Sequence, residues 1–355
     1  MIRQLLIGTV PPPTGGDALW AEGYLNYYKR KGHYIPLVNT SLIGKRAVTV
    51  DENRSFPDEI RRCIRIWRDL SFQIRLYKPN IVHMNINCSP LGTIRDFICA
   101  CIIKRNKIPF VVHCHCNIQD QIGTSRWANK FLKALLRTSN GVIAINTQSL
   151  QFVEMMCQTK AKIIPNFVSD VSCKPKVKLS NEIQKVLYVG HIRKTKGIGE
   201  LLQAAEALPN VQFLLVGTIT DDFRDFKPND CINGNVQLLG NVAHKRVLEL
   251  LDSSDVFVFP SYTEGFSLAL VEAMSRGIPC IASDVGANKD MIEDCGGVII
   301  PPRDAKAIVN AINRLASKDA RKHMGEWNVE KVRKCYTIDS VMVQLEEYYK
   351  EVLNE

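Results

Sequence analysis

The amino-acid sequence predicts an α/β protein with two Rossmann-like domains, each built on a parallel sheet. Short apolar runs recur along the chain and are near-continuous, which is typical of strands buried on both faces. Amphipathic stretches separate most of these runs, as crossover helices between parallel strands do. One polar, lysine-rich segment divides the runs into two groups and predicts a domain boundary.

Ten apolar runs are the predicted strands. They cover 4–10, 80–86, 110–116, 141–146, 186–190, 213–217, 236–240, 256–261, 279–283 and 297–302. Segment 165–185 contains two prolines and several lysines and is the predicted linker. The predicted organisation is an N-terminal domain over 1–168, a C-terminal domain over 169–335 and a terminal helix over 336–355. One possible arrangement has this helix packing back against the N-terminal domain.

Length, composition and charge restrict the function classes. A chain of 355 residues is long enough to bury two cores, and 46% hydrophobic with 23% charged residues is typical of a folded protein. No apolar run is long enough for a membrane span or a signal peptide, so we expect a cytoplasmic protein. The net charge of +10 indicates an anionic partner. That partner is a phosphorylated ligand or the inner membrane face rather than nucleic acid, because no basic-aromatic recognition motif is present.

The twelve cysteines do not predict disulfides or a metal site. No Cys-x-x-Cys pair exists, and only one residue separates Cys114 from Cys116. We expect reduced, mostly buried thiols and no bound metal.

Segment 261–277 carries the main candidate site. A predicted strand ends at Ser261, and we expect a helix to begin close to Gly265 or Phe266. Ligands of open α/β sheets bind beyond the carboxyl ends of strands, and a helix start offers unpaired N–H groups to a phosphate. Gly265 permits close approach of the backbone, and Ser267 can cap the helix or donate to a phosphate oxygen.

Two glutamates flank this phosphate position, eight residues apart. A carboxylate accepts two hydrogen bonds from a vicinal diol, so Glu272 can hold a ribose while Glu264 faces the group beyond the phosphates. The alternative is that both glutamates are solvated surface residues. Apolar neighbours on both sides of Glu272 disfavour that alternative.

The pattern Glu-x7-Glu within PSYTEGFSLALVEAMSRGIPCIASDVG resembles the signature of retaining glycosyltransferases of family 4, which have the GT-B fold of two facing Rossmann-like domains. The resemblance implies transfer of a sugar from a nucleotide diphosphate sugar, UDP- or GDP-linked, without metal or cofactor. It places Glu264 on the donor sugar and Glu272 on the nucleotide ribose. It also implies that the leaving phosphate receives the acceptor proton.

Segment VGHIRKTKGIGELLQA resembles the family's phosphate-binding turn. Lys196 and Gly197 match, whereas His191 stands where many relatives have arginine. Arg193 is the residue that can compensate, because an arginine fork binds diphosphate at any pH. A solvated basic turn is the alternative.

Two further segments resemble donor-binding parts of the family. LLGNV places backbone atoms of Asn241 and Val242 near the nucleotide base. Gly15 and Gly16 match the first glycine-rich loop, where a missing Cβ lets the backbone approach the diphosphate. A simple tight turn is the alternative for this glycine pair.

Two histidines end the strand FVVHCHC. Alternation sends His113 and His115 to one side and the two thiols to the other, which argues against a four-ligand metal site. The resemblance assigns contact with the donor sugar to His115, and His113 is the second candidate for this contact. The alternative is that both histidines are buried core residues that contact no ligand.

Segment 60–78 combines six basic residues with Trp67, Phe72 and aliphatic residues. It predicts either a helix lying on an anionic membrane or a helix packed on the sheet with its basic face in water. Segment 130–137 is a second, weaker candidate for membrane contact.

These features together favour a retaining glycosyltransferase acting on a saccharide or lipid-linked saccharide in cell-surface polysaccharide or oligosaccharide synthesis. The alternatives are a non-catalytic sugar-nucleotide binding module and a sugar-nucleotide epimerase. A dehydrogenase is disfavoured because no Gly-x-Gly-x-x-Gly follows the first strand.

Overall fold

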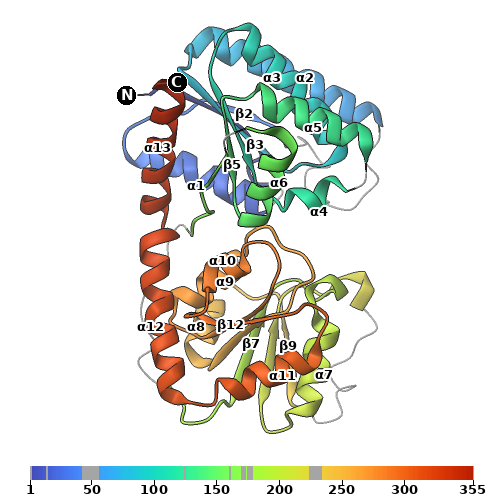
Figure 1. Ribbon diagram of the computed structural model, residues 1–355, viewed down its shortest axis with the longest axis vertical. Helices are drawn as coiled ribbons and strands as arrows, with labels where there is room; N and C mark the ends of the chain where they lie inside the picture. Colours follow the sequence, from blue (N-terminus) through green and yellow to red (C-terminus); the bar gives the residue numbers. More distant parts are fainter. Residues whose placement is uncertain are drawn as a thin grey trace. The chain divides into compact units, whose positions relative to one another are not determined.

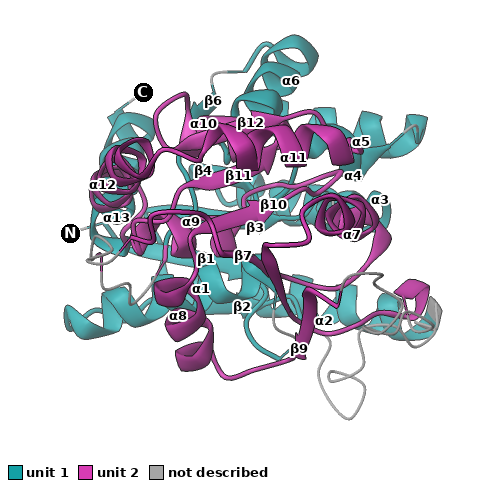
Figure 2. Cartoon of the chain, turned by 90° about the horizontal axis from the view of Figure 1, so that it is seen from below, with its two compact units in different colours: residues 1–167, 338–355 teal, residues 168–337 magenta. Residues whose placement is uncertain are grey.

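A computed structural model describes residues 2–12, 15–41, 56–123, 125–159, 161–168, 173, 179–223 and 234–354 (Figure 1). The chain forms two compact units (Figure 2): unit 1 comprises Met1–Phe167 and Ile338–Glu355, and unit 2 comprises Val168–Thr337. Val168 and Thr337, where the chain enters and leaves unit 2, form a parallel β-bridge. Each unit contains a six-stranded parallel sheet between helices, so the predicted α/β class is confirmed.

The sheet of unit 1 has the strand order β2-β1-β3-β4-β5-β6. Its strands are β1 (Gln4–Gly8), β2 (Leu37–Asn39), β3 (Ile81–Ile86), β4 (Phe110–Cys114), β5 (Gly141–Ala144) and β6 (Ala161–Ile163). Four of them were predicted. The edge strands β2 and β6 have three residues each and are too short to stand out as apolar runs.

Helices cover both faces of this sheet. They are α1 (Gly16–Arg30), α2 (Phe56–Tyr77), α3 (Pro90–Arg105), α4 (Ile118–Ile122), α5 (Arg126–Thr138), α6 (Thr147–Cys157) and α13 (Ile338–Asn354). Successive strand residues alternate between the faces. Leu5 and Ile7 pack in the cluster of α2, α3, α5 and α6, whereas Leu6 packs in the cluster of α1 and α13. The C-terminal helix therefore belongs to the core of unit 1.

The sheet of unit 2 has the order β12-β11-β10-β7-β8-β9. Its strands are β7 (Lys185–Val189), β8 (Gln212–Val216), β9 (Val236–Gly240), β10 (Val256–Phe259), β11 (Cys280–Ser283) and β12 (Gly297–Ile300), and all six were predicted. Its helices are α7 (Ile198–Ala207), α8 (His244–Ser253), α9 (Leu268–Ser275), α10 (Asn288–Ile292), α11 (Ala305–Arg314) and α12 (Lys318–Cys335), with short 3-10 turns η2 (Lys194–Lys196) and η3 (Asp221–Phe223).

A glycine fixes the turn between β7 and α7. Gly197 has φ of +70°, and a Cβ there would overlap the carbonyl oxygen of Pro260 at the end of β10. Only glycine satisfies both conditions without strain. The loops that follow two neighbouring strands can therefore touch through their backbones.

Across the described ranges, no helix is both long and apolar enough to cross a membrane.

Candidate functional site

Three loops meet at the carboxyl edge of the unit 2 sheet. They follow β7, β10 and β11, which are neighbours in the sheet. The backbone N–H of Tyr262 donates to the carbonyl of Thr195 at 2.9 Å and joins the first two loops. The Ser283 hydroxyl donates to the carbonyl of Ser261 and joins the last two. These bonds fix the position of the turn that carries Lys196 relative to segment 261–267.

Lys196 and Glu264 form an ion pair at this edge. Their side chains are only 22% and 10% exposed, and the Lys196 ammonium lies 5.4 Å from the centroid of the Phe259 ring. Gly286, with φ of +54°, packs so closely that a Cβ would overlap the carbonyl of Glu264. The structure thus brings together two predicted site residues from loops 68 positions apart.

The helix after this loop begins at Leu268, two to three residues later than predicted. The reason is that Ser267 is its N-cap: its side chain accepts a bond from the Leu270 N–H at 3.2 Å. Of the two roles expected for Ser267, the structure shows capping. Phe266 packs edge-on against Tyr336, with ring centroids 5.6 Å apart, so its half-buried ring lies against the hydrophobic core. Gly265 accepts from the Ala287 N–H at 3.1 Å.

Glu272 is the fifth residue of α9, about one turn from its start. Its carboxylate lies 3.1 Å from Nε2 of His244, the first residue of α8. His244 is not among the predicted site residues. A titratable residue two positions after Val242, directly behind the predicted base-binding loop, was the signal that could have identified it. In that loop Asn241 is exposed and Val242 half-buried.

The other predicted basic residues lie on the surface of the β7 loop. His191 and Arg193 are both exposed. The backbone of this loop is held by hydrogen bonds. The His191 carbonyl accepts from the Tyr188 hydroxyl at 2.8 Å. The Asp222 carboxylate accepts from the Lys194 N–H at 2.8 Å and holds the start of η2. Of the predicted residues of this turn, Lys196 is the one that the structure pairs with Glu264.

Gly15 and Gly16 begin α1 in unit 1. Gly15 is the N-cap with extended backbone, and neither glycine has a positive φ. A Cβ at Gly16 would meet no atom within 4 Å. Gly16 therefore borders open space at the start of the helix, whereas a Cβ at Gly15 would lie 3.1 Å from Oδ1 of Asp17.

A buried histidine cluster lies on the α1 and α13 face of unit 1. The rings of His113 and His115 are 3.9 Å apart, and both lie 5.0 Å from Trp20, so the predicted alternation is confirmed. His113 Nδ1 lies 3.3 Å from Nε2 of His83, whose Nδ1 lies 2.7 Å from the Tyr349 hydroxyl. Within the described ranges, no group of three or more His, Cys, Asp or Glu side chains could hold a metal ion.

Burial keeps these imidazoles neutral. It lowers the pKa of His83 and of His115 to about 3, and it lowers the pKa of His113 with help from the other two. Nε2 of His113 and of His115 is buried without a hydrogen-bond partner, whereas His115 Nδ1 lies 3.2 Å from Oδ1 of Asn166. The core-histidine alternative therefore accounts for the packing of these rings.

Two family models match the chain. Residues 173–335 match "Glycosyl transferases group 1" and residues 25–171 match "Glycosyltransferase Family 4". These ranges cover the greater part of both units.

Curated relatives match over part of their length. The chain is 29% identical over 188 residues to the capsular polysaccharide biosynthesis glycosyltransferase CapM of Staphylococcus aureus, covering 50% of this chain and 49% of CapM. It is 24% identical over 250 residues to the putative teichuronic acid biosynthesis glycosyltransferase TuaC of Bacillus subtilis, covering 66% and 61%. The chain thus spans about half to three fifths of these two relatives.

A solved structure matches over almost the whole chain. Anabaena HepE in complex with UDP superposes with a TM-score of 0.73 at 15% identity, covering 99% of this chain and 100% of HepE. At that identity the likeness is one of fold.

The histidine cluster predicts a pH dependence of stability. Because the folded-state pKa values lie below the ordinary value of 6.5, the unfolded chain binds more protons between about pH 3 and 6.5. The free energy of unfolding should therefore be highest above pH 6.5 and fall on acidification, by up to about 1.4 kcal/mol per pH unit for each buried histidine. Urea unfolding at pH 7 and pH 5, followed by tryptophan fluorescence, measures this.

The variant His113→Gln should show a smaller loss between these pH values, and the exposed His323→Gln should behave as wild type. An identical pH dependence in wild type and His113→Gln would contradict the assignment.

Proposed function

The chain belongs to the family 4 type of glycosyltransferases with the GT-B fold, and from that we propose that it transfers a sugar from a nucleotide diphosphate sugar to a saccharide acceptor during synthesis of a cell-surface polysaccharide. The observation that carries the proposal is the Lys196–Glu264 pair beside the start of α9 at the carboxyl edge of a parallel sheet. The names of CapM and TuaC support the polysaccharide context, and the UDP complex of HepE supports a UDP-sugar ahead of a GDP-sugar.

Each half of the donor has a partner in unit 2. The Lys196 ammonium and the N-terminus of α9 supply positive charge for the diphosphate. Glu272 accepts from the ribose hydroxyls, and Glu264 accepts from the donor sugar. In the structure Lys196 and Glu264 neutralise each other, so we propose that donor binding exchanges this pair for a lysine–phosphate contact and a glutamate–sugar contact.

We also propose that the transfer retains anomeric configuration and needs no metal. The chemistry requires stabilisation of the charge that develops on the leaving diphosphate. We assign this role to Lys196, with the exposed Arg193 on the same loop as a second cation. The leaving phosphate then takes the acceptor proton, which delivers the acceptor to the face from which the diphosphate departs.

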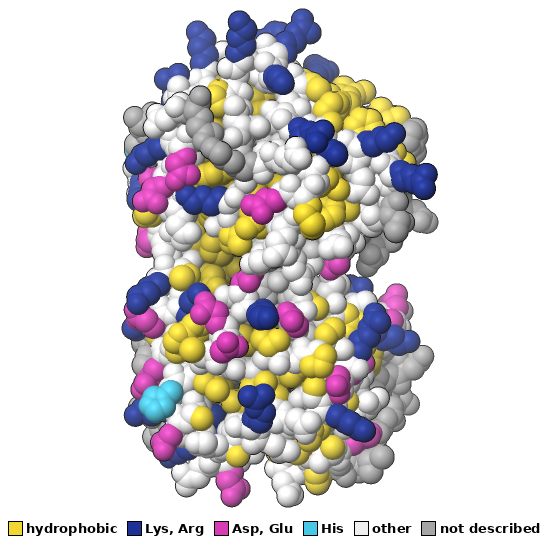
Figure 3. All heavy atoms as spheres, viewed as in Figure 1, with side chains coloured by type: hydrophobic (Ala, Val, Ile, Leu, Met, Phe, Trp, Pro, Cys, Tyr) yellow, Lys and Arg dark blue, Asp and Glu magenta, His cyan; other side chains and the backbone are white. Residues whose placement is uncertain are grey.

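Helix α2 supports a peripheral membrane contact, which we propose for an anionic bilayer surface. Its buried face consists of Ile66, Leu70 and Ile74. Its outer face carries exposed apolar side chains at helical spacing, namely Ile60, Ile64, Phe72 and Leu76, among Arg61, Arg68 and Arg75. Basic and hydrophobic side chains are also interspersed on the unit 1 surface over α3 and α5 (Figure 3).

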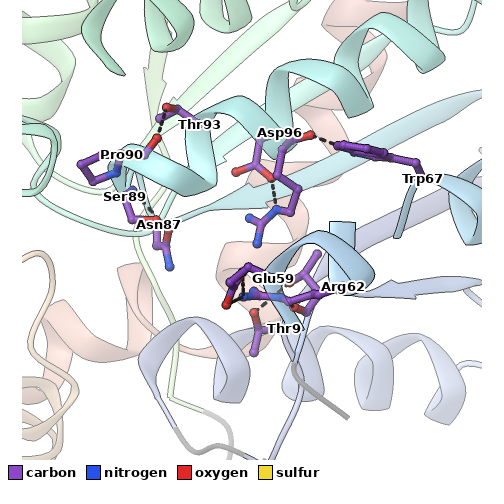
Figure 4. Close-up of polar contacts among 11 residues, drawn as sticks. Thr9, Glu59, Arg62, Trp67, Asn87, Ser89, Pro90, Thr93 and Asp96 are labelled. Carbon is purple, nitrogen blue, oxygen red and sulfur yellow. Dashed lines mark hydrogen bonds and ion pairs between the residues drawn. The ribbon is translucent and has the colours of Figure 1, made fainter. Parts of the chain in front are cut away.

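Trp67 and Arg65 do not belong to this outer stripe. The Trp67 indole donates to the carbonyl of Arg95 at 3.3 Å (Figure 4), and the Arg65 guanidinium donates to the carbonyls of Asn39 and Ser41. Both side chains hold neighbouring segments of unit 1, so the membrane contact is tested at Phe72 and Leu76 instead.

Transfer is tested with UDP-sugars and a saccharide acceptor panel in the presence of EDTA. We expect product whose new linkage has the anomeric configuration of the donor, established by NMR coupling constants. An inverted product would contradict retention, and activity that EDTA abolishes and Mg²⁺ restores would contradict metal independence. Free sugar or an epimer without any acceptor product would favour the epimerase alternative.

Membrane contact is tested by co-sedimentation with vesicles of phosphatidylglycerol and phosphatidylcholine. Phe72→Ser with Leu76→Ser should release the protein, and Arg68→Gln with Arg75→Gln should weaken binding about fivefold per arginine, since each contributes about 1 kcal/mol. Met155→Ser removes an apolar side chain on α6 that is at least as exposed as Phe72 and Leu76, and it serves as the control. Equal sedimentation of wild type and the three variants would contradict the proposed membrane contact.

A further inference from the structure

Two side-chain contacts join helices α8 and α9, which lie next to each other in unit 2 (Figure 2). Near the C-terminal ends of both helices, the Arg276 guanidinium donates to both carboxylate oxygens of Asp252, with Nε 2.6 Å from Oδ1. Closer to the N-terminal ends, Nε2 of His244 lies 3.1 Å from Oε1 of Glu272. The Arg276 side chain is only 14% exposed, so the first contact fixes how the helices lie at that end. The second contact forms between two helices that are already held together.

The contact between His244 and Glu272 has one direction. An ionised carboxylate only accepts hydrogen bonds, so Nε2 of His244 carries the proton and donates to Glu272 in both charge states of the imidazole. This bond takes one of the roughly four lone-pair positions of the carboxylate, and the others stay available to hydroxyl donors. The Glu272 side chain is 21% exposed and that of His244 is 63% exposed. The bond therefore lies at the surface of unit 2.

The position of His244 along the chain places it beside the proposed nucleoside. His244 is the first residue of α8 and follows directly after the loop of Asn241 and Val242, which we expect at the base. Glu272 is the carboxylate that we assign to the ribose hydroxyls. One imidazole thus connects the segment expected at the base with the carboxylate assigned to the ribose.

We propose that His244 is a positioning residue for Glu272 and sets how strongly the site recognises the ribose hydroxyls of the donor, a role that rests on the proposed function. A glutamate side chain turns about several bonds and loses that freedom when it binds a diol. A hydrogen bond from His244 fixes the carboxylate beforehand, which lowers the cost of binding. His244 acts through Glu272 and does not need to touch the donor itself.

The test measures the affinities of UDP and of 2′,3′-dideoxy-UDP by calorimetry for wild type and His244→Ala. The ratio of the two dissociation constants reports what the ribose hydroxyls contribute. Wild type should bind UDP about tenfold or more tightly than the dideoxy nucleotide, as expected for hydrogen bonds to a charged group. His244→Ala should lower this ratio about threefold to tenfold, the cost of immobilising one side chain. Its affinity for dideoxy-UDP should equal that of wild type.

Three further variants separate positioning from a structural effect. His244→Gln keeps an N–H donor at this position and should restore most of the ratio. Lys245→Gln changes the exposed neighbour on α8 and should behave as wild type. Glu272→Ala and the double variant His244→Ala with Glu272→Ala should show the same ratio, because the effect of His244 passes through the carboxylate.

An unchanged ratio in His244→Ala, or an equal loss of affinity for both nucleotides, would overturn the positioning role. Sugar transfer by wild type, measured on the same samples, tests the proposed function separately. If wild type transfers sugar but binds both nucleotides equally, the ribose assignment of Glu272 fails and the role of His244 fails with it. No UDP binding by wild type would contradict the proposed donor site itself.

Discussion

The half-buried ion pair between Lys196 and Glu264 is the interaction on which the unit 2 site depends. A pair only 22% and 10% exposed lies in a lower dielectric than a surface pair, so its charges interact strongly with each other and with any bound phosphate. Two glycines let the loops that carry this pair pack closely together. Gly197 packs against the carbonyl of Pro260, and Gly286 packs against the carbonyl of Glu264. The parallel sheet places these loops side by side because β7, β10 and β11 are neighbours.

Unit 1 shows a different use of polar groups at the same kind of sheet edge. Its imidazoles are neutral, buried and held by a hydroxyl from the C-terminal helix, through Tyr349 and His83. Nε2 of His113 and Nε2 of His115 are buried without hydrogen-bond partners among the described residues. Such atoms are rare in a well-packed core, and here they lie inside unit 1 rather than on its surface.

Much of this architecture could be predicted from the sequence, because buried parallel strands produce long apolar runs. Ten strands follow from such local signals, and spaced motifs identify Glu264 and Lys196 as separate candidates, but their ion pair was not predicted. The edge strands β2 and β6 were missed since three residues give no periodicity. The start of α9 was placed too early because Ser267 can either continue a helix or cap it, and only the fold decides that choice. The contacts of His244 with Glu272 and of Tyr349 with His83 join positions 28 and 266 residues apart and leave no local trace.

The most direct test of the account compares UDP affinity and sugar transfer in Glu272→Ala and Glu264→Ala. If Glu272 holds the ribose, its removal should weaken UDP binding by about tenfold to hundredfold, as expected for one or two hydrogen bonds to a charged group. Glu264→Ala should bind UDP as tightly as wild type or more tightly, because Lys196 is released to the phosphates, and should lose most of its transfer activity. Unchanged UDP affinity in Glu272→Ala, or weakened UDP affinity in Glu264→Ala, would contradict the assignment of the two glutamates.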